Sequence, residues 1–125
     1  MSISYEYYPD DGYIHTKVTD VITLQEVLAY VDLILKDNRI NQPFYELVDF
    51  AEIEKFDFGY DQSEQLYSKL ILLKNQKNHL GTCFVAYKDL PKGMANIFKV
   101  KGEGKGMNIQ IFNKIDDALE YIKNA

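Results

Sequence analysis

The seven residues Phe44-Tyr-Glu-Leu-Val-Asp-Phe50 decide how this chain is predicted to fold. They are rich in aromatic and β-branched residues, they follow Pro43, and a polar, acidic stretch comes after them, all of which favours a β-strand. Helical patterns occur on both sides of this segment in the sequence. We therefore predict that 44–50 is an interior strand of a sheet with helices covering both faces.

The segments before this strand predict a hairpin and a helix. Ile3–Tyr8 and Tyr13–Val18 are short β-type runs joined by residues 9–12 (Pro-Asp-Asp-Gly), which are typical of a tight turn. Thr23 and Glu26 have the spacing of a capping box, and apolar residues then recur every three or four positions. Because a strand, a helix and a strand make a crossover unit, we expect the second and third strands to be parallel.

The remainder of the chain alternates helices and strands. A loop is expected over 51–60, and residues 61–64 (Asp-Gln-Ser-Glu) have the pattern of a second capping box. Further strands are predicted at Leu80–Tyr87 and Met107–Phe112, and further helices after residues 61, 89 and 113. The predicted fold is one α/β domain over residues 1–125, in the order β-β-α-β-α-β-α-β-α, with a mixed, mostly parallel sheet of about five strands. The order of the strands stays open.

Composition limits the classes of protein to which this chain can belong. It has 125 residues, 46% hydrophobic and 26% charged, which is ordinary for a soluble globular protein. No apolar run approaches the roughly 18 residues of a membrane span, and the N-terminus has no signal-peptide pattern. The single Cys83 excludes an intrachain disulfide, so we expect a cytoplasmic location. The net charge of −5 argues against a nucleic-acid-binding protein.

The charges are unevenly distributed along the chain. From Phe44 to Glu64 there are seven acidic residues and one lysine. From Lys88 to Lys105, both included, there are five lysines and two acidic residues. Such regions either keep the surface solvated or steer a partner, and we favour the solvated surface. The aromatic edge of the first hairpin also leaves a homodimer open.

Several loosely specified motifs give this chain a family resemblance. They are Asp11-Gly-Tyr13 at the hairpin turn, Leu47-Val-Asp-Phe50, and the closing helix Ala118-Leu-Glu-Tyr-Ile122. With this order of elements, the chain resembles the STAS superfamily of sulfate-transporter and anti-sigma-factor-antagonist domains, and it is most similar to the SpoIIAA-like branch. The resemblance implies a non-enzymatic binding or regulatory module that acts through protein–protein contact.

Signalling members of that superfamily carry Asp-Ser-(Ser/Thr)-Gly in the loop after the central strand, where a partner kinase phosphorylates a serine. The matching residues here are Asp57-Phe58-Gly59, so an aromatic ring replaces the hydroxyl. Ser63 is a nearby hydroxyl at a predicted helix start, but its neighbours Asp61 and Glu64 would repel a phosphate. We therefore interpret Ser63 as an ordinary exposed helix residue.

Two candidate binding regions follow from these patterns. Ligands of parallel sheets bind beyond the carboxyl ends of the strands, so the first candidate is an interaction rim for a protein partner. Its residues are Asp49, Asp57, Phe58, Gly59, Asp61 and Ser63. The carboxylates between 49 and 61 match no ion-binding loop, so we predict a solvated acidic loop and no metal.

The second candidate is an apolar pocket for a small, lipid-like ligand, which would make the protein a carrier or sensor. Its residues are Phe56, Phe58, Met94, Ile97 and Phe98. Ordinary core packing explains the same pattern, and we favour core packing over the pocket.

No set of residues predicts catalysis. His15 and His79 are not at metal-ligand spacing, and we expect each to be a surface or hydrogen-bonded histidine. Cys83 lies among apolar residues and is expected to belong to the core. Residues 102–106 (Gly-Glu-Gly-Lys-Gly) follow a helix and lack the Ser or Thr of a phosphate loop, so they predict a flexible connection. We predict a protein that is not an enzyme and uses no cofactor.

Overall fold

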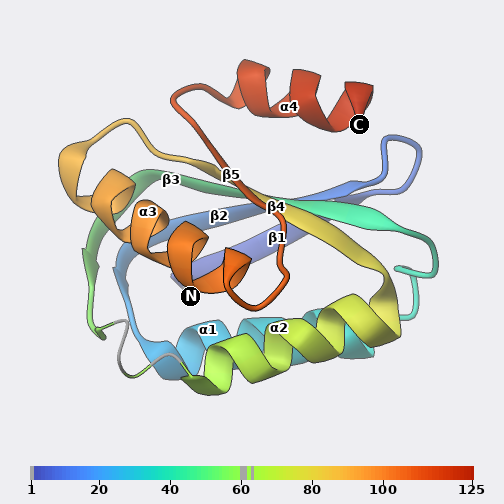
Figure 1. The fold of residues 1–125 in the computed structure, drawn as a ribbon, viewed down its shortest axis with the longest axis horizontal. Coiled ribbons are helices and arrows are strands. Elements are labelled where there is room, and N and C mark those ends of the chain that lie inside the picture. The colour runs from blue at the N-terminus through green and yellow to red at the C-terminus, as the bar shows by residue number, and fades with distance from the viewer. Residues whose placement is uncertain (1, 60–61, 63) are drawn as a thin grey trace.

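A computed structural model describes residues 2–59, 62 and 64–125 of the chain. One sheet runs through the molecule, and its strands follow each other in space as they do in the sequence (Figure 1). The strands are β1 (Ile3–Tyr8), β2 (Tyr13–Ile22), β3 (Phe44–Phe56), β4 (His79–Val85) and β5 (Ile109–Phe112). β1 is antiparallel to β2, and all other pairs are parallel. The predicted hairpin, the parallel pairing of β2 with β3 and the interior position of 44–50 are all confirmed.

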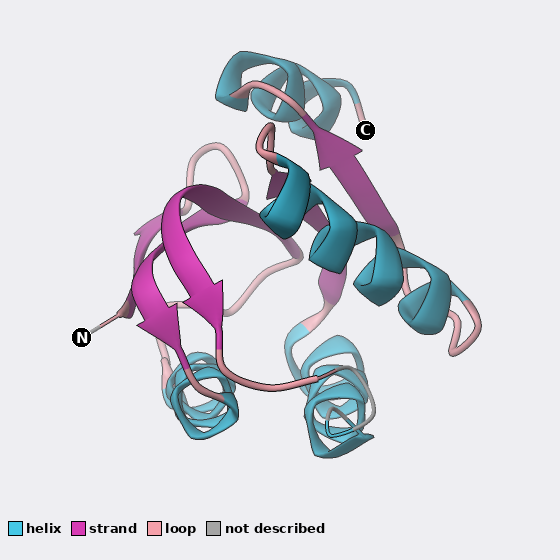
Figure 2. Cartoon of the chain, turned by 90° about the vertical axis from the view of Figure 1, so that its left-hand side faces the viewer, coloured by secondary structure: helices cyan, strands magenta, loops and turns pink. Residues whose placement is uncertain are grey.

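Helices cover both faces of this sheet. They are α1 (Leu24–Lys36), α2 (Glu64–Lys77), α3 (Asp89–Glu103) and α4 (Ile115–Asn124). Figure 2 shows α1 and α2 side by side on one face and α4 on the opposite face, with α3 beside the β5 end of the sheet. The predicted α/β fold class and element order are therefore correct. Among the residues that the structure describes, no helix is long and apolar enough to span a membrane.

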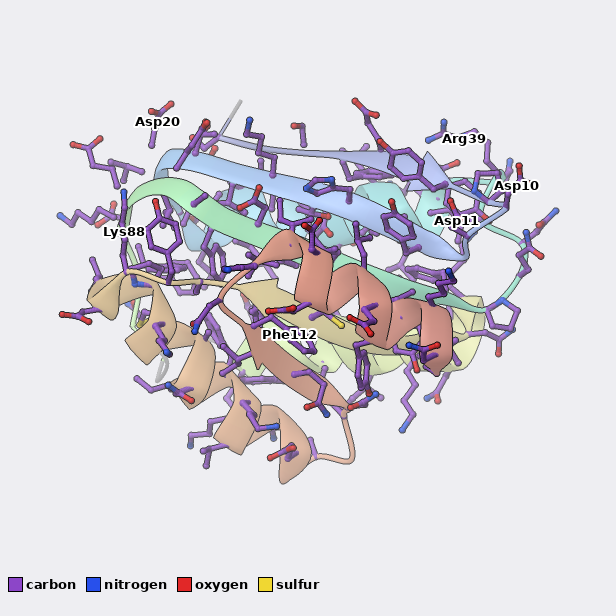
Figure 3. All side chains as sticks on the ribbon, turned by 90° about the horizontal axis from the view of Figure 1, so that it is seen from above. Asp10, Asp11, Asp20, Arg39, Lys88 and Phe112 are labelled. Atoms are coloured by element: carbon purple, nitrogen blue, oxygen red, sulfur yellow. The ribbon has the colours of Figure 1, made fainter. Side chains whose placement is uncertain are left out.

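Strand alternation divides the buried residues into two groups. On β2, Ile14, Thr16 and Val18 are buried towards α1 and α2, while His15 and Lys17 point to the other face. The larger core lies between the sheet and α1, α2 and α3. The smaller core lies under α4 and includes Leu47, Cys83, Val85, Ala118 and Ile122. α4 packs on β3, β4 and β5, so it leaves the β1–β2 part of its face uncovered (Figure 3).

The prediction of a loop over 51–60 is wrong for the first six residues, because β3 continues to Phe56. β2 also extends, to Ile22, and the two extensions pair with each other. The pairing skips one residue of β3 between Asp49 and Glu52 and another between Ile53 and Lys55, as β-bulges do. Each bulge offsets the strand alternation by one residue. As a result, residues three apart (Phe50, Ile53 and Phe56) all pack into the larger core.

Other boundaries differ from the predictions by a few residues. β4 begins at His79 and ends at Val85, and the side chains of Leu80 and Tyr87 are exposed. α1 has the predicted capping box, with the Glu26 amide donating to Thr23 Oγ1 and the Thr23 amide donating to Glu26 Oε1. The second predicted capping box depends on Asp61, which lies outside the described residues.

Candidate functional site

A cavity lies between the sheet and the layer of α1 and α2, with α3 at one side. All five strands and these three helices contribute to its wall. Of the described lining residues, only Tyr30, Glu46, Tyr67 and Thr82 carry polar side-chain atoms. The cavity volume, counted as space for the centres of water-sized molecules, is about 80 Å³. Since one water needs about 10–15 Å³ by this measure, roughly five to eight water-sized groups fit.

Glu46 is the centre of a buried polar cluster at this cavity, and only 4% of the residue is exposed. Its Oε1 accepts hydrogen bonds from His79 Nε2 at 3.0 Å and from Thr82 Oγ1 at 3.1 Å. Its Oε2 accepts a hydrogen bond from the Tyr30 hydroxyl. Because the Tyr30 proton goes to Glu46, Thr16 Oγ1 donates to the Tyr30 oxygen. We call these five residues the Glu46 cluster.

The cluster keeps Glu46 ionised. Burial raises the pKa of this carboxyl, but hydrogen bonds from His79, Tyr30 and Thr82 favour the charged form and lower the pKa below its usual value. Burial and the Glu46 charge raise the pKa of Tyr30 well above its usual value. Tyr30 is therefore a neutral donor, and Glu46 is an acceptor only.

Strand register explains why these side chains meet. Glu46 pairs with Ile14 on one side and with Thr82 on the other, and all three point to the face that α1 covers. Tyr30 approaches from α1 and is buried with Val31 and Ile34. The sequence analysis does not identify Glu46 as a site residue. A signal was present, since Glu46 is a carboxylate at an inward position of an apolar strand. A buried charge needs partners, so such a residue indicates a polar cluster.

The structure brings together part of the predicted apolar pocket. Phe56, Phe58 and Phe98 line the cavity, with ring centroids 6.2 Å apart for Phe56 and Phe58 and 6.4 Å apart for Phe58 and Phe98. Met94 and Ile97 are partly buried on α3, outside the lining residues. The three aromatic rings pack in the core and form cavity wall at the same time.

No protein-family model and no curated protein matches the sequence. Among solved structures, the chain is similar to an uncharacterised protein of the DUF3478 family, with a SpoIIAA-like fold, from Shewanella loihica PV-4. The TM-score is 0.59 at 17% sequence identity, and the match covers 96% of this chain and 91% of that chain. This chain has a SpoIIAA-like fold. The resemblance inferred from the sequence is thus confirmed for the fold.

The SpoIIAA-like sheet separates the residues of the predicted interaction rim. Asp49 lies on the α4 face, is 7% exposed, and accepts a hydrogen bond of 2.9 Å from the Ala51 amide. Its Oδ2 is 3.8 Å from Nε2 of His15. Phe58, in contrast, packs against Phe98 in the core on the opposite face.

The other described rim residues follow β3 directly. Asp57 is exposed, and its amide donates to the Ile22 carbonyl at 2.8 Å. The Gly59 amide donates to the side chain of Gln62 at 3.1 Å. Asp61 and Ser63, the remaining two, lie outside the described residues. The structure therefore keeps Asp57, Phe58 and Gly59 in one segment and places Asp49 across the sheet from Phe58.

The segment 102–106, predicted as a connection, lies partly in α3, which ends at Glu103, and partly in the turn that follows. Gly102 is buried and belongs to the last turn of α3, where a Cβ atom would lie 2.3 Å from Cδ1 of Ile109. Gly106 has a φ of +81°, which suits the turn that leads to β5. In the part of the chain that the structure describes, no three His, Cys, Asp or Glu side chains gather in a way that would hold a metal ion.

Proposed function

We propose that this SpoIIAA-like protein binds a small apolar molecule in the cavity at Glu46 and serves as its carrier or sensor. The observation that carries this proposal is the wall of the cavity, which is almost entirely apolar and includes a few convergent polar groups. Ligand sites for small molecules typically combine these two properties.

The cost of an empty cavity supports this proposal. Protein interiors are close-packed, and a cavity destabilises the fold by about 24 cal/mol per Å³. For a cavity of about 80 Å³, the cost is on the order of 2 kcal/mol. A ligand that fills the space restores the lost contacts, so binding and stability are coupled.

We propose a non-enzymatic role for the same site. Burial, followed by the charge of Glu46, raises the pKa of the Cys83 thiol to about 12, so this thiol is not ionised at neutral pH. Cys83 also packs under α4, on the face of the sheet opposite the cavity. The Glu46 carboxylate is held by three donors, which suits an acceptor that orients a ligand.

Native mass spectrometry of freshly purified protein tests this proposal, because a retained ligand adds to the mass. Toluene titrations followed by amide NMR shifts test the cavity directly, with shifts expected for residues around Val48 and Phe84. The Val27→Phe variant fills the cavity from α1 and should abolish these shifts. Val100→Phe makes the same change on α3 at a side chain that is 72% exposed, and should bind as the native protein does. Equal binding by both variants would refute the proposal.

Protein contact near the end of β3 is a second candidate function. The observation in its favour is a group of exposed carboxylates at Glu52, Glu54 and Asp57, close to each other in the sequence. Such a surface suits a basic partner. A pull-down comparing native protein with Asp57→Lys tests it: a partner captured equally well by both would count against this surface.

A further inference from the structure

Glu46 has one acceptor position left on the carboxylate that faces the cavity. Two carboxylate oxygens provide about four lone-pair positions. Among the described residues, Oε1 accepts two hydrogen bonds, from His79 and Thr82, and Oε2 accepts one, from Tyr30. One position on Oε2 is therefore open to a donor from a bound molecule.

The two hydroxyls that donate to Glu46 do not compete for this position. The Tyr30 hydroxyl already donates to Oε2 and accepts from Thr16. The Thr82 hydroxyl has a single proton, which it donates to Oε1. A ligand thus meets an acceptor at Glu46, and neither hydroxyl has a second proton to donate to a ligand acceptor.

We infer that the cavity selects a neutral molecule with an aromatic or similarly apolar body and one hydroxyl donor, such as a phenol, which donates to Oε2 of Glu46. This inference rests on the proposed function and specifies its ligand. The aromatic wall of the cavity favours an aromatic or apolar ligand body. The ring centroids of Phe50 and Phe84 are 5.2 Å apart and stacked, and the ring centroid of Phe98 is 6.0 Å from that of Phe84. The size of the cavity limits the ligand to about one ring with a substituent.

Charged head groups are excluded for two separate reasons. A carboxylate on the ligand would be buried beside the Glu46 carboxylate, and two like charges in an apolar site repel strongly. An ammonium group has three donors, and Oε2 can accept only one of them. The other two would face a wall in which Tyr67 is the one polar lining residue, among those described, outside the Glu46 cluster, so at least one donor would lack a partner at a cost.

Three probes of the same shape test the inference on the native protein: toluene, p-cresol and p-toluate. A hydrogen bond to a charged acceptor is expected to make p-cresol bind about tenfold more tightly than toluene. p-Toluate should not bind measurably at neutral pH. The inference is overturned if toluene binds as tightly as p-cresol, or if p-toluate binds as well as p-cresol. If the inference is overturned in one of these ways, binding of toluene would still support the proposed function. If none of the three probes binds, the inference and the proposed function are both overturned.

The Glu46→Gln variant assigns the selectivity to one side chain. Its amide removes the negative charge, so the preference for p-cresol over toluene should fall to about threefold or less and p-toluate should bind more tightly than to the native protein. Glu52→Gln makes the same change at an exposed position of β3 and should keep the native ratios. Unchanged ratios in a folded Glu46→Gln protein would contradict the inference. If that variant does not fold, the three probes on the native protein decide alone.

Discussion

The Nε2 atom of His79 lies 3.0 Å from Oε1 of Glu46, and each side chain is only 5% exposed. This contact joins the first residue of β4 to the third residue of β3. Thr82 donates to the same oxygen at 3.1 Å. Since a buried carboxylate that loses a donor keeps the cost of its desolvation, this contact should matter for stability as well as for binding.

Replacement of His79 by alanine should therefore destabilise the fold by about 1.5–3 kcal/mol, the usual range for a hydrogen bond to a charged group. Urea unfolding at neutral pH measures the change. His15→Ala is the matched control, because His15 Nε2 is 3.8 Å from Asp49 and its side chain is 30% exposed. We expect that control to lose less than about 1 kcal/mol. Equal losses in the two variants would contradict a special role for the Glu46 contact.

The stability of the native protein should fall in acid partly because of Glu46. The pKa of Glu46 is lower in the folded protein than its usual value of 4.5. The ionised group therefore stabilises the fold above that value, and the contribution is lost as the pH falls through the folded pKa. Between neutral pH and about pH 3.5, native protein should lose more free energy of unfolding than Glu46→Gln, in which this group cannot titrate. Parallel losses in both proteins would show that other carboxylates cause the acid sensitivity.

Two glycines of α3 should respond differently to alanine. A Cβ atom at Gly93 meets no atom within 4 Å, so Gly93→Ala should stabilise the helix by about 0.5–1 kcal/mol. A Cβ atom at Gly102 would lie 2.3 Å from Cδ1 of Ile109, which lines the cavity. Gly102→Ala should therefore gain nothing or lose stability. Thermal unfolding of the two variants compares them, and an equal gain in both would contradict the close packing of α3 on β5.

The Cys83 thiol should be inert in the folded protein. It is fully buried, and burial raises its pKa to about 12. A thiol reagent such as Ellman's should label it only as fast as the fold opens, and labelling should become immediate in concentrated urea. Rapid labelling under native conditions would mean that the face under α4 opens more easily than its packing indicates.

Hydrophobic patterns predicted the fold because they repeat locally. The run from Phe44 to Phe50, the alternation on β2 and the Thr23 capping box each depend on residues that are close in sequence. The extension of β3 was missed, since its two bulges change the period from two to three, and exposed acidic residues lie between the inward ones. A search for alternating residues does not detect such a strand.

The Glu46 cluster was missed for a different reason. Its members come from β2, α1, β3 and β4, and they meet only through the register of the sheet and the packing of α1 on it. His79 was expected to be a surface or hydrogen-bonded histidine, and it is hydrogen-bonded, but the partner was not predictable. The sequence predicts Phe56, Phe58 and Phe98 as pocket residues, whereas it indicates Glu46 only as part of a strand.

The two bulges of β3 also mean that this strand contains two more residues than its pairing with β2 requires. Each bulge is a residue of β3 that β2 does not match, so a homologue lacking one of them would still pair in the same register on either side of the gap. Phe56 would then keep its place in the cavity wall, although the chain before it had become shorter. Deletions in evolution should accordingly be tolerated between Asp49 and Phe56. They should not be tolerated between Phe44 and Asp49, where each residue of β3 pairs with a residue of β4.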